Sequence, residues 1–242
     1  FGRQGVGRDV FLGELLHRLA VHSQGLSLFY LVPPNDRQAA RDMLRQDEEF
    51  VGKTDVAGAV QTVWLLTDRA TDPAFAAATD LFDATAYFNP LLAVQGLWPA
   101  VDPLLSQSRF LDASRVGPEH VETARRVRET LARAKETMTD PVFLELAALG
   151  ATAQAARRAS EFAQARLPAL SPEDRLLVAR ARKLQRFFTQ PFFVAEPYTS
   201  TPGKWVSRAE TIQACQAILD GDADALPEES FRFVGNWSEA AR

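Results

Sequence analysis

Several features that mark common classes of protein are scarce in this sequence of 242 residues. There is one cysteine, Cys215, so no internal disulfide can form, and its place in an apolar helical pattern predicts a buried packing residue. No apolar run reaches the roughly 20 residues that span a bilayer. A formal net charge of -4 argues against a clustered basic surface for nucleic acid or anionic membrane. We therefore expect a soluble or peripheral protein of a reducing compartment, with no nucleic-acid partner and no direct membrane insertion.

Patterns of metal ligands and nucleophiles are also sparse. His17 and His22 do not share a helical face, and His120 falls in a capping turn, so no metal site is predicted. The segment 51–54, VGKT, looks like part of a phosphate-binding loop. The first glycine of such a loop would fall at Asp47, and no strand precedes it, so we interpret the match as chance.

The first half of the chain alternates between helix and strand signals. Helical spacing of apolar residues from Val10 to Val21 predicts a helix, and the continuous apolar run 26–32 is typical of a buried parallel strand. A second such strand is predicted at 60–66, and a further helix from about Phe82 to Val94. These signals favour an α/β domain over residues 1–117.

From residue 118 onward the signals are helical. Ser171 and Pro172 predict the start of a helix that runs to about Gln190, and Ser207 with Glu210 predicts a capping box for a helix that ends near Gly221. A charged helix is predicted before these two helices, and apolar residues at spacings of three and four form a narrow stripe along it. The stripe consists of Val121, Ala124, Val127, Leu131, Ala134 and Met138. We expect an all-α bundle over residues 118–242.

The most specific stretch is 170–196, LSPEDRLLVARARKLQRFFTQPFFVAE. It resembles the carboxy-terminal domain of the β subunit of F-type ATP synthases, in which an acidic turn leads into the sequence VARARKIQRFLSQPFFVAE. The segment 98–109, WPAVDPLLSQSR, is similar to the family's YPAVDPLDSTSR, and 60–85 follows a family segment in register. The resemblance implies a reduced P-loop (RecA-like) nucleotide-binding domain followed by the family's helical carboxy-terminal domain.

The resemblance places a phosphate-binding loop at 2–9, GRQGVGRD. Such a loop needs glycines whose N–H groups wrap phosphate, a lysine that neutralises it, and a hydroxyl that binds Mg²⁺. Gly2, Gly5 and Gly7 remain, but Arg8 replaces the lysine and Asp9 the hydroxyl residue. Arg8 keeps a positive charge, so phosphate binding stays open. A carboxylate about 4 Å from a phosphate oxygen repels it by roughly 4 kcal/mol, part of which a bridging Mg²⁺ recovers.

The resemblance also locates the catalytic groups of the family. The glutamate that orients the attacking water aligns with Pro34, which cannot accept a proton. The strand whose aspartate holds Mg²⁺ should precede Val60, yet 46–59 contains no apolar strand that ends in aspartate. We therefore predict no catalytic residue, an inactive chain and no required cofactor, with ADP or ATP binding without turnover left open.

Aromatic residues match the adenine pocket of the family. Trp98 and Tyr198 stand at the matching positions, with Phe192 nearby. Such a pair can stack a purine, or it can fill the seam between the two halves of the chain, which is the interpretation we favour.

Two segments match surfaces that touch the rotor in the family, a loop at 68–72 and an acidic turn at 169–174. Arg69 replaces an acid and the turn has lost most of its negative charge, so we expect any rotor contact to be altered. Ordinary helix amino-terminal charge is the alternative for the turn. The candidate contact residues are Asp68, Arg69, Thr71, Asp72, Ser171, Glu173 and Asp174.

The resemblance implies a function for the whole chain. We expect a non-catalytic β-like structural or accessory subunit of a proton-transporting F-type ATP synthase assembly, docked on α-like and β-like subunits and near a γ-type rotor subunit. Its place would be peripheral to an energy-transducing membrane, on the mitochondrial matrix side or the bacterial cytoplasmic side. A regulatory subunit that binds nucleotide without turnover, and a working β subunit, remain as alternatives. Because the chain opens at Phe1 on a glycine-rich turn without Met, we also expect residues before it.

Overall fold

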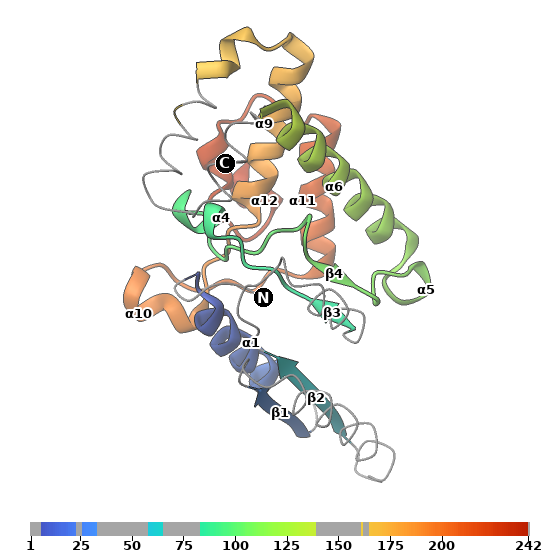
Figure 1. Ribbon diagram of the computed structural model, residues 1–242, viewed down its shortest axis with the longest axis vertical. Coiled ribbons are helices and arrows are strands. Elements are labelled where there is room, and N and C mark those ends of the chain that lie inside the picture. The colour runs from blue at the N-terminus through green and yellow to red at the C-terminus, as the bar shows by residue number, and fades with distance from the viewer. Residues whose placement is uncertain are drawn as a thin grey trace.

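The computed structural model of the chain describes residues 6–22, 83–138, 161 and 165–241, and the backbone of two strands at 26–32 and 58–64. The described chain has a helical part and a smaller part that contains a parallel strand pair (Figure 1). Within the described residues, no helix combines the length and apolar character needed to cross a bilayer.

Three long helices make up the helical part: α6 (Pro118–Met138), α9 (Pro172–Phe187) and α11 (Arg208–Asp220). Each of them packs on the other two, and the short elements η3 (Glu228–Phe231) and α12 (Trp237–Ala240) cover α9 and α11. The residues that form the shared core are Val127, Leu131, Ala134, Val178, Ala181, Leu184, Phe187, Ala214, Cys215, Ile218, Leu219, Ala223, Phe231 and Ala240.

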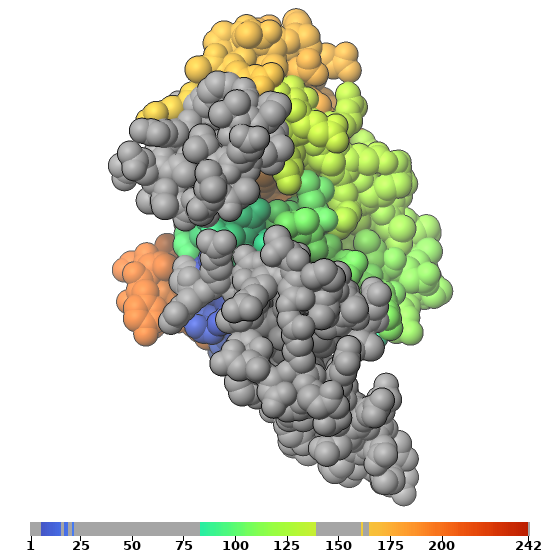
Figure 2. Space-filling view, viewed as in Figure 1, coloured from blue at the N-terminus to red at the C-terminus, as the bar shows by residue number. Residues whose placement is uncertain are grey.

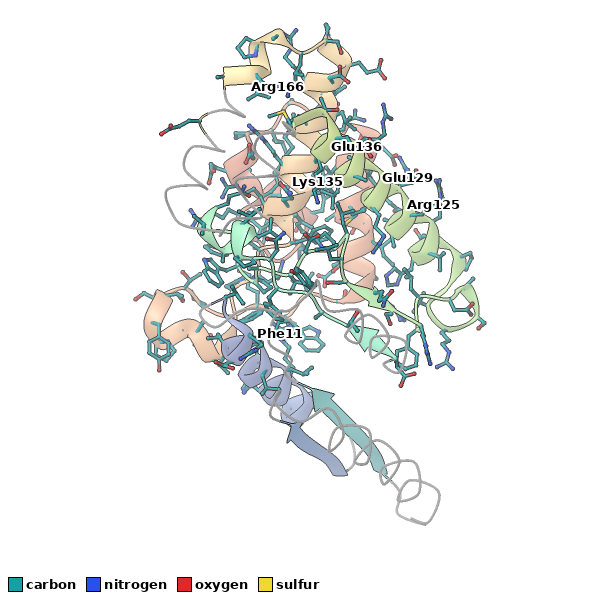
Figure 3. All side chains as sticks on the ribbon, viewed as in Figure 1. Phe11, Arg125, Glu129, Lys135, Glu136 and Arg166 are labelled. Atoms are coloured by element: carbon teal, nitrogen blue, oxygen red, sulfur yellow. The ribbon has the colours of Figure 1, made fainter. Side chains whose placement is uncertain are left out.

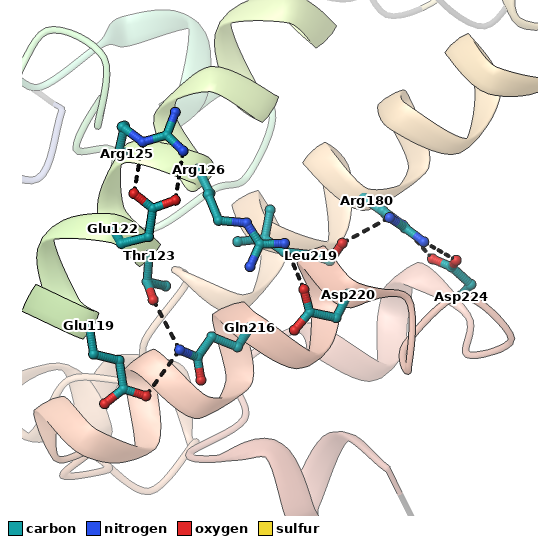
Figure 4. Close-up of polar contacts among 10 residues, drawn as sticks. All are labelled: Glu119, Glu122, Thr123, Arg125, Arg126, Arg180, Gln216, Leu219, Asp220 and Asp224. Atoms are coloured by element: carbon teal, nitrogen blue, oxygen red, sulfur yellow. Dashed lines mark hydrogen bonds and ion pairs between the residues drawn. The ribbon is translucent and has the colours of Figure 1, made fainter.

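Helix α6 buries one face, as its apolar spacing predicts. Val127, Leu131 and Ala134 are buried, and the stripe residues nearer the helix ends are half-buried. The sequence pattern missed one buried residue, Thr123, whose hydroxyl accepts a hydrogen bond of 3.2 Å from Gln216 of α11 (Figure 4). A polar residue fits this buried position because its hydroxyl finds a partner there.

The predicted start of α9 is confirmed, and its predicted end is wrong. The Ser171 hydroxyl accepts a 3.0 Å hydrogen bond from the Asp174 backbone N–H. The helix ends at Phe187, three residues before Gln190. A proline at 191 disfavours helical geometry at Gln190, and the Gln190 N–H donates to the Trp98 carbonyl at 3.1 Å instead.

Both predicted ends of α11 are confirmed. The Glu210 N–H donates to the Ser207 hydroxyl at 3.2 Å, and the Ser207 N–H donates to the Glu210 carboxylate at 2.8 Å, which completes a capping box. Gly221 follows the helix with a φ of 103°, the left-handed geometry that favours glycine. Cys215 is buried as predicted, and burial raises the pKa of its thiol to about 12.

Charged side chains of α9 secure the end of α11. Lys183 is only 5% exposed, and its ammonium donates to the carbonyls of Ala223 and Asp224 at 2.8 and 3.1 Å. Arg180 donates to the Leu219 carbonyl at 2.8 Å and pairs with the Asp224 carboxylate (Figure 4). Positive charge is favourable there because the carboxy-terminal carbonyls of a helix carry partial negative charge.

The amino-terminal part begins with α1 (Arg8–His22), followed by β1 (Leu26–Val32) and β2 (Gly58–Trp64). The two strands are parallel, with Leu26 opposite Gly58 and Val32 opposite Trp64. Parallel pairing is confirmed, and β2 lies two residues before its predicted bounds. Residues 33–57, between the two strands, lie outside the described residues.

The helix predicted from about Phe82 to Val94 is wrong for its described first part. Residues Ala84–Thr85 form β3, which pairs antiparallel with β4 (Gln107–Ser108). Only α4 (Pro90–Val94) is helical, because the Asn89 side chain accepts from the Leu91 N–H at 3.0 Å and caps a new start. Pairing with a strand more than 20 residues away overrides the local helical pattern.

The predicted domain boundary near Gly117 falls between α5 (Ala113–Val116) and α6. Gly117 has a φ of 88° and caps α5. Hydrogen bonds join the chain before Gly117 to the chain after it. The Arg128 guanidinium of α6 donates to the main-chain carbonyls of 103, 104 and 106, and the first of these bonds is 2.6 Å long. The division of the chain at this residue stays a prediction.

Truncating Leu184 should weaken the core strongly. The side chain is 0% exposed, so Leu184→Ala should lower the free energy of unfolding by about 3 kcal/mol, through lost burial and the cavity left behind. The matched change Leu176→Ala on the same helix removes a side chain that is 42% exposed and should cost less than about 1 kcal/mol. Urea unfolding followed by circular dichroism measures both, and equal losses would contradict the assigned core.

Candidate functional site

A glycine in left-handed geometry precedes α1. Gly7 has a φ of 79°, and the Phe11 N–H donates to the Gly7 carbonyl at 2.9 Å. A Cβ added at Gly7 would lie 2.8 Å from the six-membered ring of Trp98, so only glycine fits. Gly2 and Gly5 lie outside the described residues.

Arg8 and Asp9 form the first turn of α1. The Arg8 Nε lies 3.8 Å from the Asp9 carboxylate, and the two side chains are 15% and 78% exposed. Among the described residues of this turn, Arg8 is the cation that a phosphate would meet, and an acid that faces solvent accompanies it. An aspartate is well placed in a first helical turn without any ligand, because it interacts favourably with the helix dipole.

The two candidate aromatic residues lie in different environments. Trp98 packs on Gly7 and is 37% exposed, so it lies in the seam between the start of α1 and the chain that follows α9. Tyr198 belongs to α10 (Glu196–Thr199) and is 89% exposed, so it does not fill this seam. Figure 2 shows the α10 segment protruding beside the visible part of α1. Phe192 does lie in the seam, with its ring centroid 6.1 Å from that of Phe11.

A buried aspartate supports the turn that carries Trp98. Asp102 is 6% exposed and accepts from the Asn89 amide and the Leu104 N–H, each at 2.9 Å. Its own N–H donates to the Tyr87 carbonyl at 2.8 Å. This aspartate of the VDP motif thus has a structural role that its position in the sequence did not reveal.

A buried acid that the sequence analysis did not select links α1 to the carboxy-terminal half. Glu14 is 2% exposed and accepts from the Arg18 Nε at 2.6 Å and from the Val194 N–H of η2 (Phe193–Ala195) at 3.2 Å. Arg18 also donates to the Lys204 carbonyl at 3.0 Å and lies 5.2 Å from the Trp205 ring centroid. The spacing of four between acid and base was visible, but the burial was not.

The predicted contact turn on α9 is a helix cap in the structure. The Ser171 hydroxyl donates to the Asp174 carboxylate at 2.8 Å, and Glu173 is exposed on the same turn. A rotor contact at this turn stays a prediction. Asp68, Arg69, Thr71 and Asp72, together with Pro34 and residues 46–59, lie outside the described residues.

The histidines and other ionisable residues give no metal centre in the part of the chain that is described. No three His, Cys, Asp or Glu side chains gather there as metal ligands would. The His120 Nδ1 is buried and has no hydrogen-bond partner among those residues. Burial lowers the pKa of His120, and the positive charge of Arg208 lowers it further, so the ring is neutral at pH 7.

Comparison with models of known protein families finds none that matches this chain. The resemblance to ATP synthase β subunits therefore rests on the motifs of the sequence alone. In the structure these motifs position two helices. Segments 98–102 and 190–196 contact α1, and segment 180–186 binds the chain at the end of α11.

Replacing Glu14 tests the link between α1 and η2. Glu14→Gln removes the charge that pairs with Arg18, so we expect a loss of about 2 kcal/mol in the free energy of unfolding. Glu136→Gln, at an exposed position of α6 labelled in Figure 3, should change it by less than about 0.5 kcal/mol. Urea titration provides both values, and a Glu14→Gln protein as stable as the unmodified chain would show that the buried pair contributes nothing.

Proposed function

We propose that this chain is a non-catalytic, β-like structural or accessory subunit of an F-type ATP synthase assembly. In this proposal residues 1–117 are a reduced P-loop (RecA-like) domain and residues 118–242 the helical carboxy-terminal domain. The motif 170–196 supports it, since this stretch forms the centre of the described fold: Leu184 and Phe187 are core residues, and Val194 receives the buried Glu14.

The observation that carries the non-catalytic part of the proposal is the charge of the first turn of α1. Asp9, at 78% exposed, stands where a phosphate-binding helix presents a hydroxyl, and it lies 3.8 Å from Arg8. At an effective dielectric of about 20, a carboxylate about 4 Å from a phosphate oxygen costs roughly 4 kcal/mol, which is about a thousandfold in affinity. Pro34, which aligns with the catalytic glutamate of the family, cannot act as a general base, and this also supports a chain without turnover.

The partners in this proposal are α-like and β-like subunits, with a γ-type rotor subunit as a further neighbour. The assembly would lie at an energy-transducing membrane, on the mitochondrial matrix side or the bacterial cytoplasmic side. The chain would contribute surface and shape, and its neighbours would supply the nucleotide chemistry.

Purification from the native source tests the partner assignment. A tagged chain, solubilised in mild detergent, should elute with α-like and β-like subunits in fixed ratio, because subunit contacts in such assemblies are large and apolar. Mass spectrometry and native electrophoresis identify the species. A chain that elutes by itself from membranes that still contain intact ATP synthase would contradict the proposal.

A second candidate function follows from the exposure of two aromatic rings. Trp98 and Tyr198 are 37% and 89% exposed, so both retain surface on which a purine can stack. A nucleotide sensor without turnover would use these rings together with Gly5, Gly7 and Arg8.

Calorimetric titration with Mg²⁺–ATP and Mg²⁺–ADP separates these functions. We expect no binding tighter than about millimolar and no hydrolysis, because Asp9 repels the phosphates. The double change Arg8→Lys with Asp9→Thr should raise the affinity by at least about a hundredfold without restoring turnover. Micromolar binding that is lost in Trp98→Ala would establish the sensor, and Mg²⁺-dependent turnover that is lost in Arg8→Ala would establish a working ATPase.

A further inference from the structure

A cavity of about 750 Å³ opens between α1, α6, α11 and the segment that carries β3 and β4. Its volume lies in the range of small-molecule sites. Four phenyl rings line it, one from α1 and three from other segments: Phe11, Phe88, Phe110 and Phe188. The Phe11 and Phe88 rings meet edge to face, with centroids 5.3 Å apart. Figure 3 labels Phe11, at the junction of α1 with the rest of the described chain.

The charge of the cavity wall has one sign. Among the described residues that line it, Arg8 and Arg128 are cationic and no aspartate or glutamate is present. His120 and Cys215 also belong to the wall and are neutral at pH 7, since burial lowers the pKa of the imidazole and raises that of the thiol to about 12.

Arg128 differs from its neighbours on α6 in the groups that it contacts. Arg125 pairs with the carboxylate of Glu129. Figure 4 shows Arg125 with Glu122, and Arg126 with Asp220 at 2.6 Å. The hydrogen bonds of Arg128 instead go to main-chain carbonyls of 103, 104 and 106, at 2.6 to 3.1 Å. Carbonyl acceptors fix the exposed Arg128 guanidinium at the wall without a carboxylate partner, so the described residues of the wall carry positive charge.

We propose that this cavity binds an amphipathic anion, with one carboxylate or sulfonate on an apolar body the size of a medium-chain fatty acid. The apolar body lies against the phenyl rings, and the anionic group lies toward Arg128, because Asp9, 3.8 Å from Arg8, offsets the charge of Arg8. Gly7, Trp98 and Tyr198 do not line the cavity, so the site is separate from the remnant of the phosphate loop apart from Arg8. The proposal does not depend on a role in ATP synthase.

A ligand series tests the proposed chemistry. Fluorescence of 1-anilinonaphthalene-8-sulfonate reports occupancy, and laurate, dodecanol and dodecylammonium compete with it below their micellar concentrations. Because the three competitors have apolar chains of the same length, their charge decides the order of their affinities. Laurate should bind at least about tenfold more tightly than dodecylammonium, and dodecanol should bind with an affinity between the two. Equal binding of laurate and dodecylammonium would overturn the proposal.

Two pairs of variants locate the binding in the cavity. Ala124 lines the cavity and Ala132 of the same helix does not, so Ala124→Trp should weaken laurate binding at least about tenfold and Ala132→Trp should leave it unchanged. Arg128→Gln should weaken laurate about tenfold and dodecanol little, whereas Arg133→Gln removes an equal charge from an exposed position and serves as its control.

A cooperative thermal unfolding transition shows that a variant is folded. If Arg128→Gln does not fold, the ligand series on the unmodified chain tests whether the cavity prefers an anion. Laurate binding that is indifferent to Ala124→Trp would place the ligand elsewhere and overturn the proposal. Sedimentation with phosphatidylglycerol vesicles should leave the protein in the supernatant, because the ligand enters as a free molecule. If the chain sediments with the vesicles and does not bind laurate, its partner is a lipid surface, and the proposed binding in the cavity is contradicted.

Discussion

A buried carboxylate joins α1 to the carboxy-terminal half of the described chain. Glu14 has almost no contact with water, so it needs partners, and it finds one on its own helix, Arg18, and one in the other half, the Val194 N–H. This arrangement fixes α1 against η2. With α1 in place, Gly7 meets the ring of Trp98, and Phe11 reaches the wall of the cavity.

The residues that carry the resemblance to ATP synthase β subunits have structural tasks that need no nucleotide. Lys183 and Arg180 bind the carbonyls and the acid at the end of α11, and Asp102 supports the turn of Trp98. A chain can therefore keep these motifs for its shape where, as proposed here, Arg8 and Asp9 replace the lysine and the hydroxyl residue of a phosphate loop. This separation of shape from chemistry is the physical basis for proposing a subunit without turnover.

Sequence patterns were most informative where the structure depends on neighbouring residues. The cap at Ser171, the capping box of Ser207 and Glu210, and the end of α11 at Gly221 each involve groups within a few residues, and all are confirmed. The helix expected at 82–94 was wrong because β3 pairs with β4, a contact between distant residues that no local spacing encodes. Several site residues, Gly2, Gly5 and the loop 68–72 among them, lie outside the described residues and stay predictions.

By itself the sequence determined the helix boundaries set by caps, the buried stripe of α6 and the parallel strand pair. These features follow from the chemistry of each residue and its near neighbours. Only the tertiary structure decided that Glu14 is buried, that Tyr198 faces solvent and that Arg128 lines a cavity whose described wall residues include no acid. Burial and the local sign of charge depend on which distant segments pack together, and that information is absent from spacing along the chain.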